Sequence, residues 1–261
     1  MAVHKRYFFV FALVLLLAAA GFGQAPKASD LVGEKLTFNG KLTKFLTLDI
    51  ADLTFSMTQA PDNGNYVIAT EAHSKGSLLK LFRFSFLEQY SSTVDRDTFN
   101  IIKTTKHDVQ KERVRDSVAD FDYKDKRVTF VENDPKNPNK PPRSIASDMT
   151  APMNDLVSAI YSARLRPLSV GKTFDLPVSD SGLVYNIPVK VTGRELQKTV
   201  LGKVWCFRVE PDVFGPGRLI EKEGKMTIWI TDDDRRIPVR GQIDTFVKVE
   251  VRLKSATNSK A

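Results

Sequence analysis

Cysteine and histidine are scarce in this chain, and their scarcity excludes several classes of protein. The 261 residues include one cysteine, Cys206, and three histidines. A lone cysteine cannot form an intramolecular disulfide, so a disulfide-stapled fold is excluded. Scattered histidines with one cysteine do not supply the clustered ligands of a zinc site. A cysteine nucleophile would need a histidine to activate it, and neither His73 nor His107 lies in a recognisable motif. The flanking apolar residues predict that Cys206 is buried in a strand, and an intermolecular disulfide or a reactive thiol is the alternative.

The sequence also lacks the motifs of common enzymes and of nucleic-acid-binding proteins. It contains no glycine-rich phosphate loop and no G-x-S-x-G motif, and Ser179–Gly182 is best interpreted as a hairpin turn. The cationic segments Lys103–Lys106 and Lys111–Arg115 have no aromatic neighbours that could stack on bases. We therefore expect no cofactor, no metal and no nucleic-acid partner.

A long apolar run occurs only at the N-terminus. The basic residues His4–Arg6 precede the apolar run Tyr7–Ala20, and small residues follow as far as Ala25. This order is typical of a secretory signal peptide. A helix of this length spans roughly 21 Å, less than the roughly 30 Å of a hydrocarbon core, although an uncleaved anchor is the alternative. We expect residues 1–23 to be a signal peptide. The mature chain, 24–261, is then exported, periplasmic or secreted, without a transmembrane span.

The charge balance is basic. Lysine and arginine number 39 against 31 acidic residues, which gives a net charge of +8. Removal of Lys5 and Arg6 with the signal peptide leaves 8 − 2 = +6. Such a charge is sufficiently explained by solubility, and attraction to an anionic envelope surface is the alternative.

Alternation of apolar and polar residues dominates the mature chain and predicts strands. Val247, Val249, Val251 and Leu253 alternate with charged residues, as in an antiparallel strand with one wet face. The segments Val118–Tyr123 and Arg127–Val131 flank a polar turn and predict a hairpin. The proline-rich segment 133–143 has no apolar side chain and predicts a solvated loop.

One segment, Asn154–Arg166, has helical spacing instead. Asn154 or Asp155 can cap its N-terminus, and Arg164 and Arg166 suit the negative end of the helix dipole. The predicted apolar stripe consists of Leu156, Ala159, Ile160 and Ala163.

These elements predict one all-β domain with its core in residues 36–254. We expect an antiparallel, strongly curved sheet or half-barrel with the helix packed on it, and a β-sandwich is the alternative. Splitting the chain at the proline-rich segment would leave two small sheets with open edges.

Several segments resemble a known family. They are NDLVSAIYSARLRPLSVGKTFDLPV from Asn154, VYNIPVKVTGREL, LGKVWCFRVEP, KEGKMTIWITDDDRRIPVRGQI and FVKVEVRL. They are similar to blocks of the bacterial exported proteins grouped as domain of unknown function 3108, and the similarity extends over roughly Leu36 to Leu253. The resemblance implies a secreted or periplasmic all-β protein, similar to the half-barrels of lipoprotein carriers. It supplies no catalytic residues.

Two hypotheses about function remain open at this point. A row of aromatics at Phe82, Phe84, Phe86 and Trp229 suggests an apolar concave face for an apolar or amphipathic ligand such as a lipid, or for an envelope partner. Ordinary core packing is the alternative role for these rings. The second hypothesis is a hydrolase that acts on envelope polymers through Asp232 and Asp234. The run Thr231–Arg236 lacks calcium-ligand spacing, and we interpret it as a structural turn. We favour the non-enzymatic binder.

Overall fold

The computed structural model describes residues 24–75 and 85–258. The predicted signal peptide, 1–23, and the aromatics Phe82 and Phe84 lie outside the described residues. The described strands are β1 (Glu34–Thr43), β2 (Thr47–Gln59), β3 (Tyr66–Ser74), β4 (Phe86–Val94), β5 (Ile101–Gln110), β6 (Arg113–Asp122), β7 (Arg127–Asn133), β8 (Arg143–Asp148), β9 (Thr173–Asp180), β10 (Leu183–Thr199), β11 (Gly202–Pro211), β12 (Lys225–Thr231), β13 (Pro238–Asp244) and β14 (Lys248–Asn258). A 3₁₀ turn, η1 (Ala28–Leu31), precedes them, and the helix α2 (Leu156–Arg164) connects β8 to β9.

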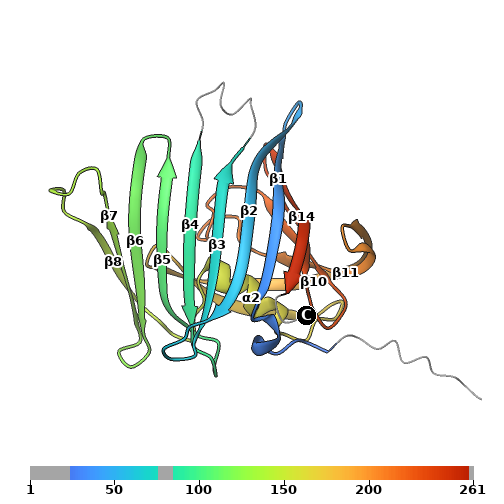
Figure 1. Ribbon diagram of the computed structural model, residues 1–261, viewed down its shortest axis with the longest axis horizontal. Coiled ribbons are helices and arrows are strands. Elements are labelled where there is room, and N and C mark those ends of the chain that lie inside the picture. Colours follow the sequence, from blue (N-terminus) through green and yellow to red (C-terminus); the bar gives the residue numbers. More distant parts are fainter. Residues whose placement is uncertain (1–23, 76–84, 259–261) are drawn as a thin grey trace, which may run out of the picture.

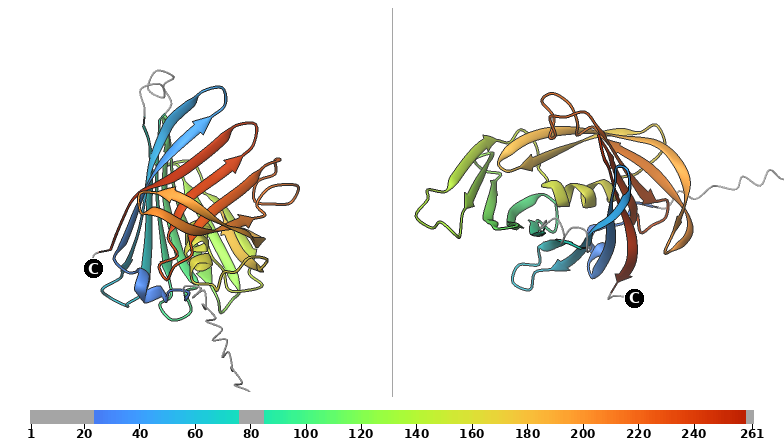
Figure 2. Two further views of the ribbon diagram at one scale, coloured as in Figure 1. Left: turned by 90° about the vertical axis from the view of Figure 1, so that its right-hand side faces the viewer. Right: turned by 90° about the horizontal axis from the view of Figure 1, so that it is seen from above.

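All these strands belong to one antiparallel sheet. Its order is β8-β7-β6-β5-β4-β3-β2-β1-β14-β13-β12-β11-β10-β9, so the first and last of the described strands pair in the middle of the sheet. The sheet curves around α2, which lies on its concave side (Figures 1 and 2). The predicted curved sheet with one packed helix is confirmed. The β-sandwich alternative is wrong, because a single sheet wraps back on itself instead of splitting into two.

Irregular pairing accompanies the curvature. The register shifts at five places, including Thr37/Phe38 and Gly40/Lys41 in β1 and Val191/Gly193 in β10. Each such bulge places an extra residue on one strand and increases the local twist and bend. The sheet therefore rolls up strongly, although in the described residues no ladder joins its edge strands β8 and β9.

A hairpin turn makes contact across this open side. Ser181 and Gly182 connect β9 to β10 with φ angles of 50° and 81°, as the favoured two-residue hairpin turn requires. A Cβ atom on Gly182 would lie 2.7 Å from Phe130 Cβ in β7 and 3.0 Å from Ile145 Cβ in β8. The predicted turn at Ser179–Gly182 is thus confirmed, and its backbone touches the other end of the sheet.

The helix has one of its two predicted N-caps, but two of its side chains differ from the prediction. Asp155 is the N-cap, and its carboxylate accepts hydrogen bonds from the backbone N–H groups of Val157 and Ser158. Leu156, expected in the apolar stripe, is 37% exposed, whereas Arg164, expected only to interact with the negative end of the helix dipole, is completely buried. The sheet curves around the helix and covers more of it than one stripe. Val157 and Tyr161 pack in one core cluster, and Ala159 and Ala163 pack in a second.

The proline-rich segment has the predicted character. It connects β7 to β8 as an almost entirely exposed loop, and the short strand β8 begins at its last residue, Arg143. β8 was not predicted from the sequence.

Candidate functional site

An apolar groove lies on the concave side of the sheet, between α2 and strands β1, β2, β12, β13 and β14. Its cavity has a volume of about 160 Å³. The side chains that carry its apolar character are Leu36, Phe38, Leu53, Phe55, Ile160, Tyr161, Met226, Ile228, Ile243, Val249 and Val251. Strands from both ends of the chain and the helix between them therefore line the groove together.

The polar residues at the groove are already paired. The guanidinium of Arg240 points to the other face of the sheet, where it donates to Glu250 Oε1 at 2.6 Å and lies 4.3 Å from the centre of the Trp229 ring. Arg164 is bound to Glu34, as described below. The groove thus offers hydrocarbon surface and has no unpaired charge for a polar ligand group.

Trp229 lies on the other face of the sheet from this groove. Met226 and Ile228, which precede Trp229 in β12 by three residues and by one, both line the groove. Because successive side chains of a strand point to opposite faces, Trp229 points away from it. The Trp229 Nε1–H donates to Glu195 Oε2 at 3.0 Å. Phe86 is half-buried at the start of β4, away from the groove. The structure therefore does not bring Phe86 and Trp229 together.

Sequence reasoning missed most of the residues that form the groove, although part of the signal was present. The alternation of Val249 and Val251 with charged residues marks one apolar face of β14. Nothing in the sequence shows that Phe38 and Phe55, in β1 and β2, continue that face. They do so because β14 pairs with β1, and β1 pairs with β2.

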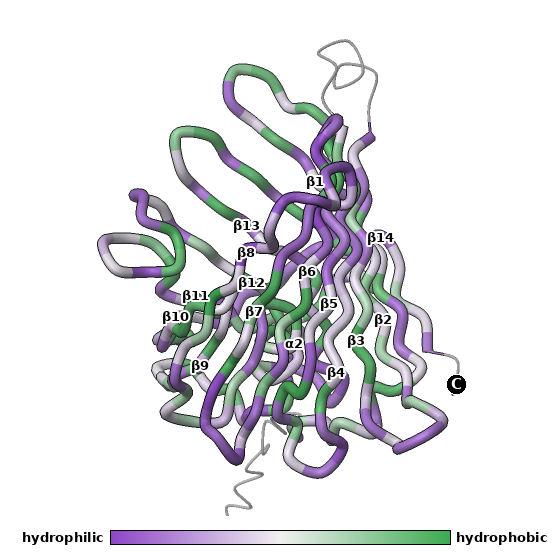
Figure 3. Tube along the Cα trace, turned by 90° about the vertical axis from the view of Figure 1, so that its left-hand side faces the viewer, coloured by the Kyte–Doolittle hydropathy of each residue, from purple (hydrophilic) through white to green (hydrophobic). Residues whose placement is uncertain are grey.

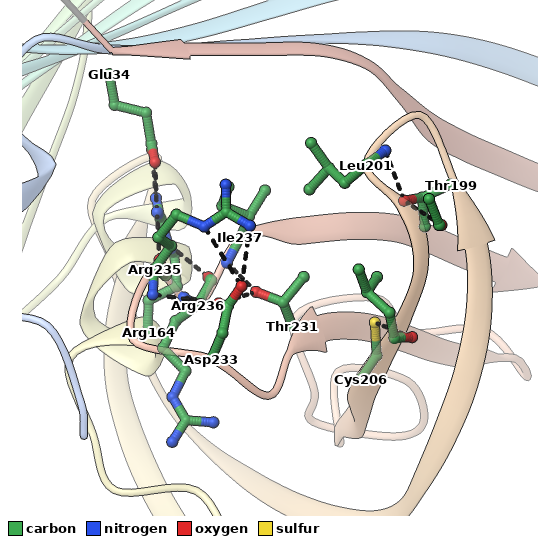
Figure 4. Close-up of polar contacts among 12 residues, drawn as sticks. Glu34, Arg164, Thr199, Leu201, Cys206, Thr231, Asp233, Arg235, Arg236 and Ile237 are labelled. Carbon is green, nitrogen blue, oxygen red and sulfur yellow. Dashed lines mark hydrogen bonds and ion pairs between the residues drawn. The ribbon is translucent and has the colours of Figure 1, made fainter. Parts of the chain in front are cut away.

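A buried ion pair supports the helix beside the groove (Figure 4). The Arg164 guanidinium contacts both oxygens of Glu34 at 2.6 and 2.7 Å. Its Nε–H donates to the carbonyl of Arg236 at 2.8 Å, and a further N–H donates to that of Arg235 at 3.2 Å. The Tyr161 ring lies 5.0 Å away. This bidentate pair anchors α2 to β1 and to the β12–β13 turn.

The acidic run after β12 forms a structural turn. Asp233 Oδ1 accepts hydrogen bonds from Thr231 Oγ1 at 2.6 Å and from the N–H groups of Arg235 and Arg236. These bonds, and the partner Arg235 guanidinium, lower the pKa of the Asp233 carboxyl in spite of its burial. Within the described residues no cluster of histidine, cysteine and carboxylate groups is arranged to hold a metal ion.

The two carboxylates of the hydrolase hypothesis have different surroundings. The Asp232 side chain is 3% exposed and contacts Arg194 at 2.6 Å and Arg236 at 3.4 Å. Asp234 is exposed to solvent. A general acid and a general base must both face the bond that is cleaved, and Asp232 is held by two guanidinium groups instead. This geometry favours the structural role.

Cys206 is buried in β11, as predicted (Figure 4). Burial, together with the nearby carboxylates of Asp233, Asp232 and Glu195, raises the pKa of its thiol to about 12. The thiol is therefore protonated at neutral pH, whereas a nucleophilic cysteine needs the thiolate.

A second, polar cleft lies between strands β4–β7 and the β9–β10 turn. It has a volume of about 200 Å³ and includes Tyr90, Lys106, Arg115 and Asp180. Burial is the main cause of a raised pKa at both Tyr90 and Asp180, and the positive charges of Lys106 and Arg143 only partly offset it at Asp180.

Because the pKa of Asp180 is raised, we predict that Asp180→Asn increases the stability of the folded state by an amount that depends on pH. Below the ordinary carboxyl pKa of 3.8, the folded and the unfolded chain both hold the proton. Above it the unfolded chain releases the proton first, so the folded state loses stability until the pH passes the folded-state pKa. We expect Asp180→Asn to raise the urea midpoint at pH 7 and to leave it nearly unchanged at pH 3. An equal gain at both pH values would contradict this account.

The chain is similar to one family model and to solved structures. The chain matches the family model described as a protein of unknown function, DUF3108, over residues 36–254. A β-barrel-like protein of domain of unknown function DUF1849 from Brucella abortus has a similar fold, with a TM-score of 0.57 and 11% sequence identity; the match covers 87% of this chain and 98% of that one. A candidate exported protein with a YmcC-like fold from Bacteroides fragilis has a TM-score of 0.33 and 11% identity; that match covers 91% of this chain and 99% of that one.

The comparison with curated proteins yields no significant match. In the described part of the chain, no helix is long and apolar enough to cross a membrane. The family match covers most of the chain, including the helix beside the groove and all or most of each described strand. The segments between Asn154 and Leu253 that resemble family blocks all lie within this match. The chain therefore belongs to the DUF3108 family of proteins of unknown function.

Proposed function

We propose that this protein is a non-enzymatic, exported protein of the cell envelope that binds the apolar part of an amphipathic molecule, such as a lipid, in the groove beside α2. The observation that carries the proposal is the groove itself, an apolar concavity on a curved sheet. Small-molecule sites are concave and mostly apolar, with a few polar groups that orient the ligand.

The size of the groove suits a short length of hydrocarbon. A dry cavity of about 150 Å³ lined by aliphatic and aromatic side chains can hold a benzene-sized molecule. The groove is comparable, at about 160 Å³. Removing about 100 Å² of hydrocarbon from water is worth about 2.5 kcal/mol. An acyl chain would thus gain modest affinity here while its polar end stays in solvent.

Export is supported by the N-terminal sequence. The order of basic, apolar and small residues in 1–23 is that of a signal peptide. We propose that residues 24–261 form a single mature domain in the periplasm or outside the cell. Peptide mass mapping of the protein recovered from its native envelope tests this, since a fragment that retains Tyr7–Ala20 would contradict it.

Binding in the groove is tested with cis-parinaric acid, a fluorescent linear fatty acid. Ile243→Gln places an amide in the groove without a partner, and we expect the dissociation constant to rise by about tenfold. Val249→Trp fills the same space and should weaken binding by a similar factor. Fluorescence titration measures both, and circular dichroism establishes that each variant is folded.

The matched control is Leu183→Gln, an exposed position in the β9–β10 hairpin. It should leave probe binding unchanged. The proposal fails if the unchanged protein does not bind the probe, or if all three variants bind it as the unchanged protein does.

A further inference from the structure

The tips of two adjacent hairpins expose large apolar side chains. Phe45 and Leu46, between β1 and β2, are 95% and 61% exposed, and Phe246, between β13 and β14, is 80% exposed. Both hairpins project from the same end of the sheet (Figure 2), and their tips include strongly hydrophobic positions (Figure 3). Exposed apolar side chains gathered at one place mark a contact surface, whereas scattered ones do not.

Sheet pairing brings the two tips together. β1 pairs with β14, and Thr43 lies opposite Lys248 at the base of both turns. The Lys44 Nζ lies 5.4 Å from the centre of the Phe45 ring and 5.7 Å from that of Phe246. The two tips are therefore one surface, consisting of Lys44, Phe45, Leu46 and Phe246, which we call the tip patch.

The charge at the tip patch is of one sign. Across the turn residues 44–46 and 245–247, Lys44 is the charged side chain, and it is a cation. The long stem of a lysine can lie along apolar rings while its ammonium remains at a polar boundary. Two rings, a leucine and an ammonium group at one protruding edge match the boundary between hydrocarbon and anionic headgroups of a bilayer.

The area of the tip patch argues against a second copy of the chain as its partner. Phe45, Leu46 and Phe246 together expose on the order of 450 Å², judged from the usual area of such side chains. A stable protein interface buries about 800 Å² on each partner. Insertion of a few side chains into a lipid surface needs no such area, because binding strength grows with whatever apolar area enters the bilayer.

We propose that the tip patch docks the protein on the surface of a bilayer that contains anionic lipids, with Phe45, Leu46 and Phe246 inserted below the headgroups and Lys44 at headgroup level. This inference goes beyond ligand binding in the groove and does not depend on it. The two sites lie near each other along the strands, since Ile243 and Val249, which line the groove, lie close to the ends of β13 and β14 at the Phe246 turn.

Vesicle flotation tests the proposal with a chain that begins at Gln24. All described strands and the three core clusters lie after this residue, so the chain retains the complete described fold, and it omits the apolar run Tyr7–Ala20, which would bind lipid by itself. We expect the protein to bind vesicles of equimolar phosphatidylglycerol and phosphatidylcholine, and Phe45→Ser/Phe246→Ser to reduce the partition coefficient by about tenfold or more. Lys44→Glu should weaken binding to these vesicles more than to phosphatidylcholine alone.

The matched control is Val200→Ser, at an exposed apolar position in the β10–β11 turn, which should bind vesicles as the unchanged protein does. Absence of vesicle binding by the unchanged protein, or equal binding by the double variant, would overturn the proposal. Concentration-dependent dimerisation that the double variant abolishes, with no vesicle binding, would assign the tip patch to a second copy instead. Probe binding in the groove is measured separately, so loss of one activity leaves the other interpretable.

Discussion

Replacing Arg164 with methionine is expected to lower the free energy of unfolding by about 3–5 kcal/mol, the usual result of breaking a buried ion pair at one partner. Arg164 is completely buried, and its partner Glu34 has only 8% of its side chain exposed. Without the guanidinium, the Glu34 carboxylate would be left as an uncompensated buried charge. The carbonyls of Arg235 and Arg236 would also lose their donors. Urea denaturation followed by circular dichroism measures the loss.

A double-mutant cycle separates the ion pair from the packing of the arginine stem. Glu34→Gln/Arg164→Met removes both charges, so we expect the two losses to be less than additive, with a coupling of about 1–3 kcal/mol. Arg127→Met, at an exposed position in β7, is the matched control and should change stability by less than about 0.5 kcal/mol. A loss below about 1 kcal/mol for Arg164→Met would show that the pair does not anchor the helix.

Gly182→Ala is expected to have the second largest effect, a loss of about 2–4 kcal/mol. Two causes combine at this position. The φ angle of 81° lies in the left-handed region, where a side chain strains the backbone. The added methyl would also lie 2.7 Å from Phe130 Cβ and 3.0 Å from Ile145 Cβ, so β7 and β8 would have to move away from the turn. Thermal and urea denaturation both report the loss.

Gly171→Ala separates these two causes. Gly171 has a similar φ angle of 87°, and a Cβ atom there would meet nothing within 4 Å. It should therefore lose only the backbone contribution, about 1–2 kcal/mol. Equal losses for the two variants would mean that the contact between the β9–β10 turn and strands β7 and β8 contributes nothing.

Local features of the fold were predictable because each depends on near neighbours in the chain. The alternation of Val249 and Val251 with charged residues marks a strand whose two faces have different surroundings. The turn at Ser181–Gly182 and the cap at Asp155 follow from the backbone preferences of those residue types. The same reasoning correctly predicted that Cys206 is a buried strand residue.

The fate of Arg164 was not predictable from the helix alone. Its position near the C-terminus of the helix suggested only a cation that interacts with the helix dipole. It is buried because Glu34, 130 residues earlier in the chain, faces it from β1. A pattern confined to one helix contains no information about a partner so distant in sequence.

The residues of the groove were likewise only partly predictable from the sequence. Alternation along β12 separates Ile228 from Trp229, but it does not say which of the two faces the concave side. The aromatic side chain of Trp229 suggested that its face of β12 binds the ligand. In the structure, Trp229 instead contacts Arg240 and Glu195 on the face opposite the groove. The groove and the tip patch both arise from the pairing of β1 with β14, which joins segments more than 200 residues apart.

The sequence by itself determined that this is a β-rich chain with one capped helix, a solvated proline-rich loop and a cysteine buried in a strand, because periodicity, turn residues and caps act over a few residues. The tertiary structure alone decided the order of the strands, the burial of Arg164, the face that forms the groove and the meeting of Phe45 with Phe246. Those features depend on which distant segments pair. That choice is made by the burial of apolar area and of paired charge over the whole sheet, and no short stretch of sequence contains it.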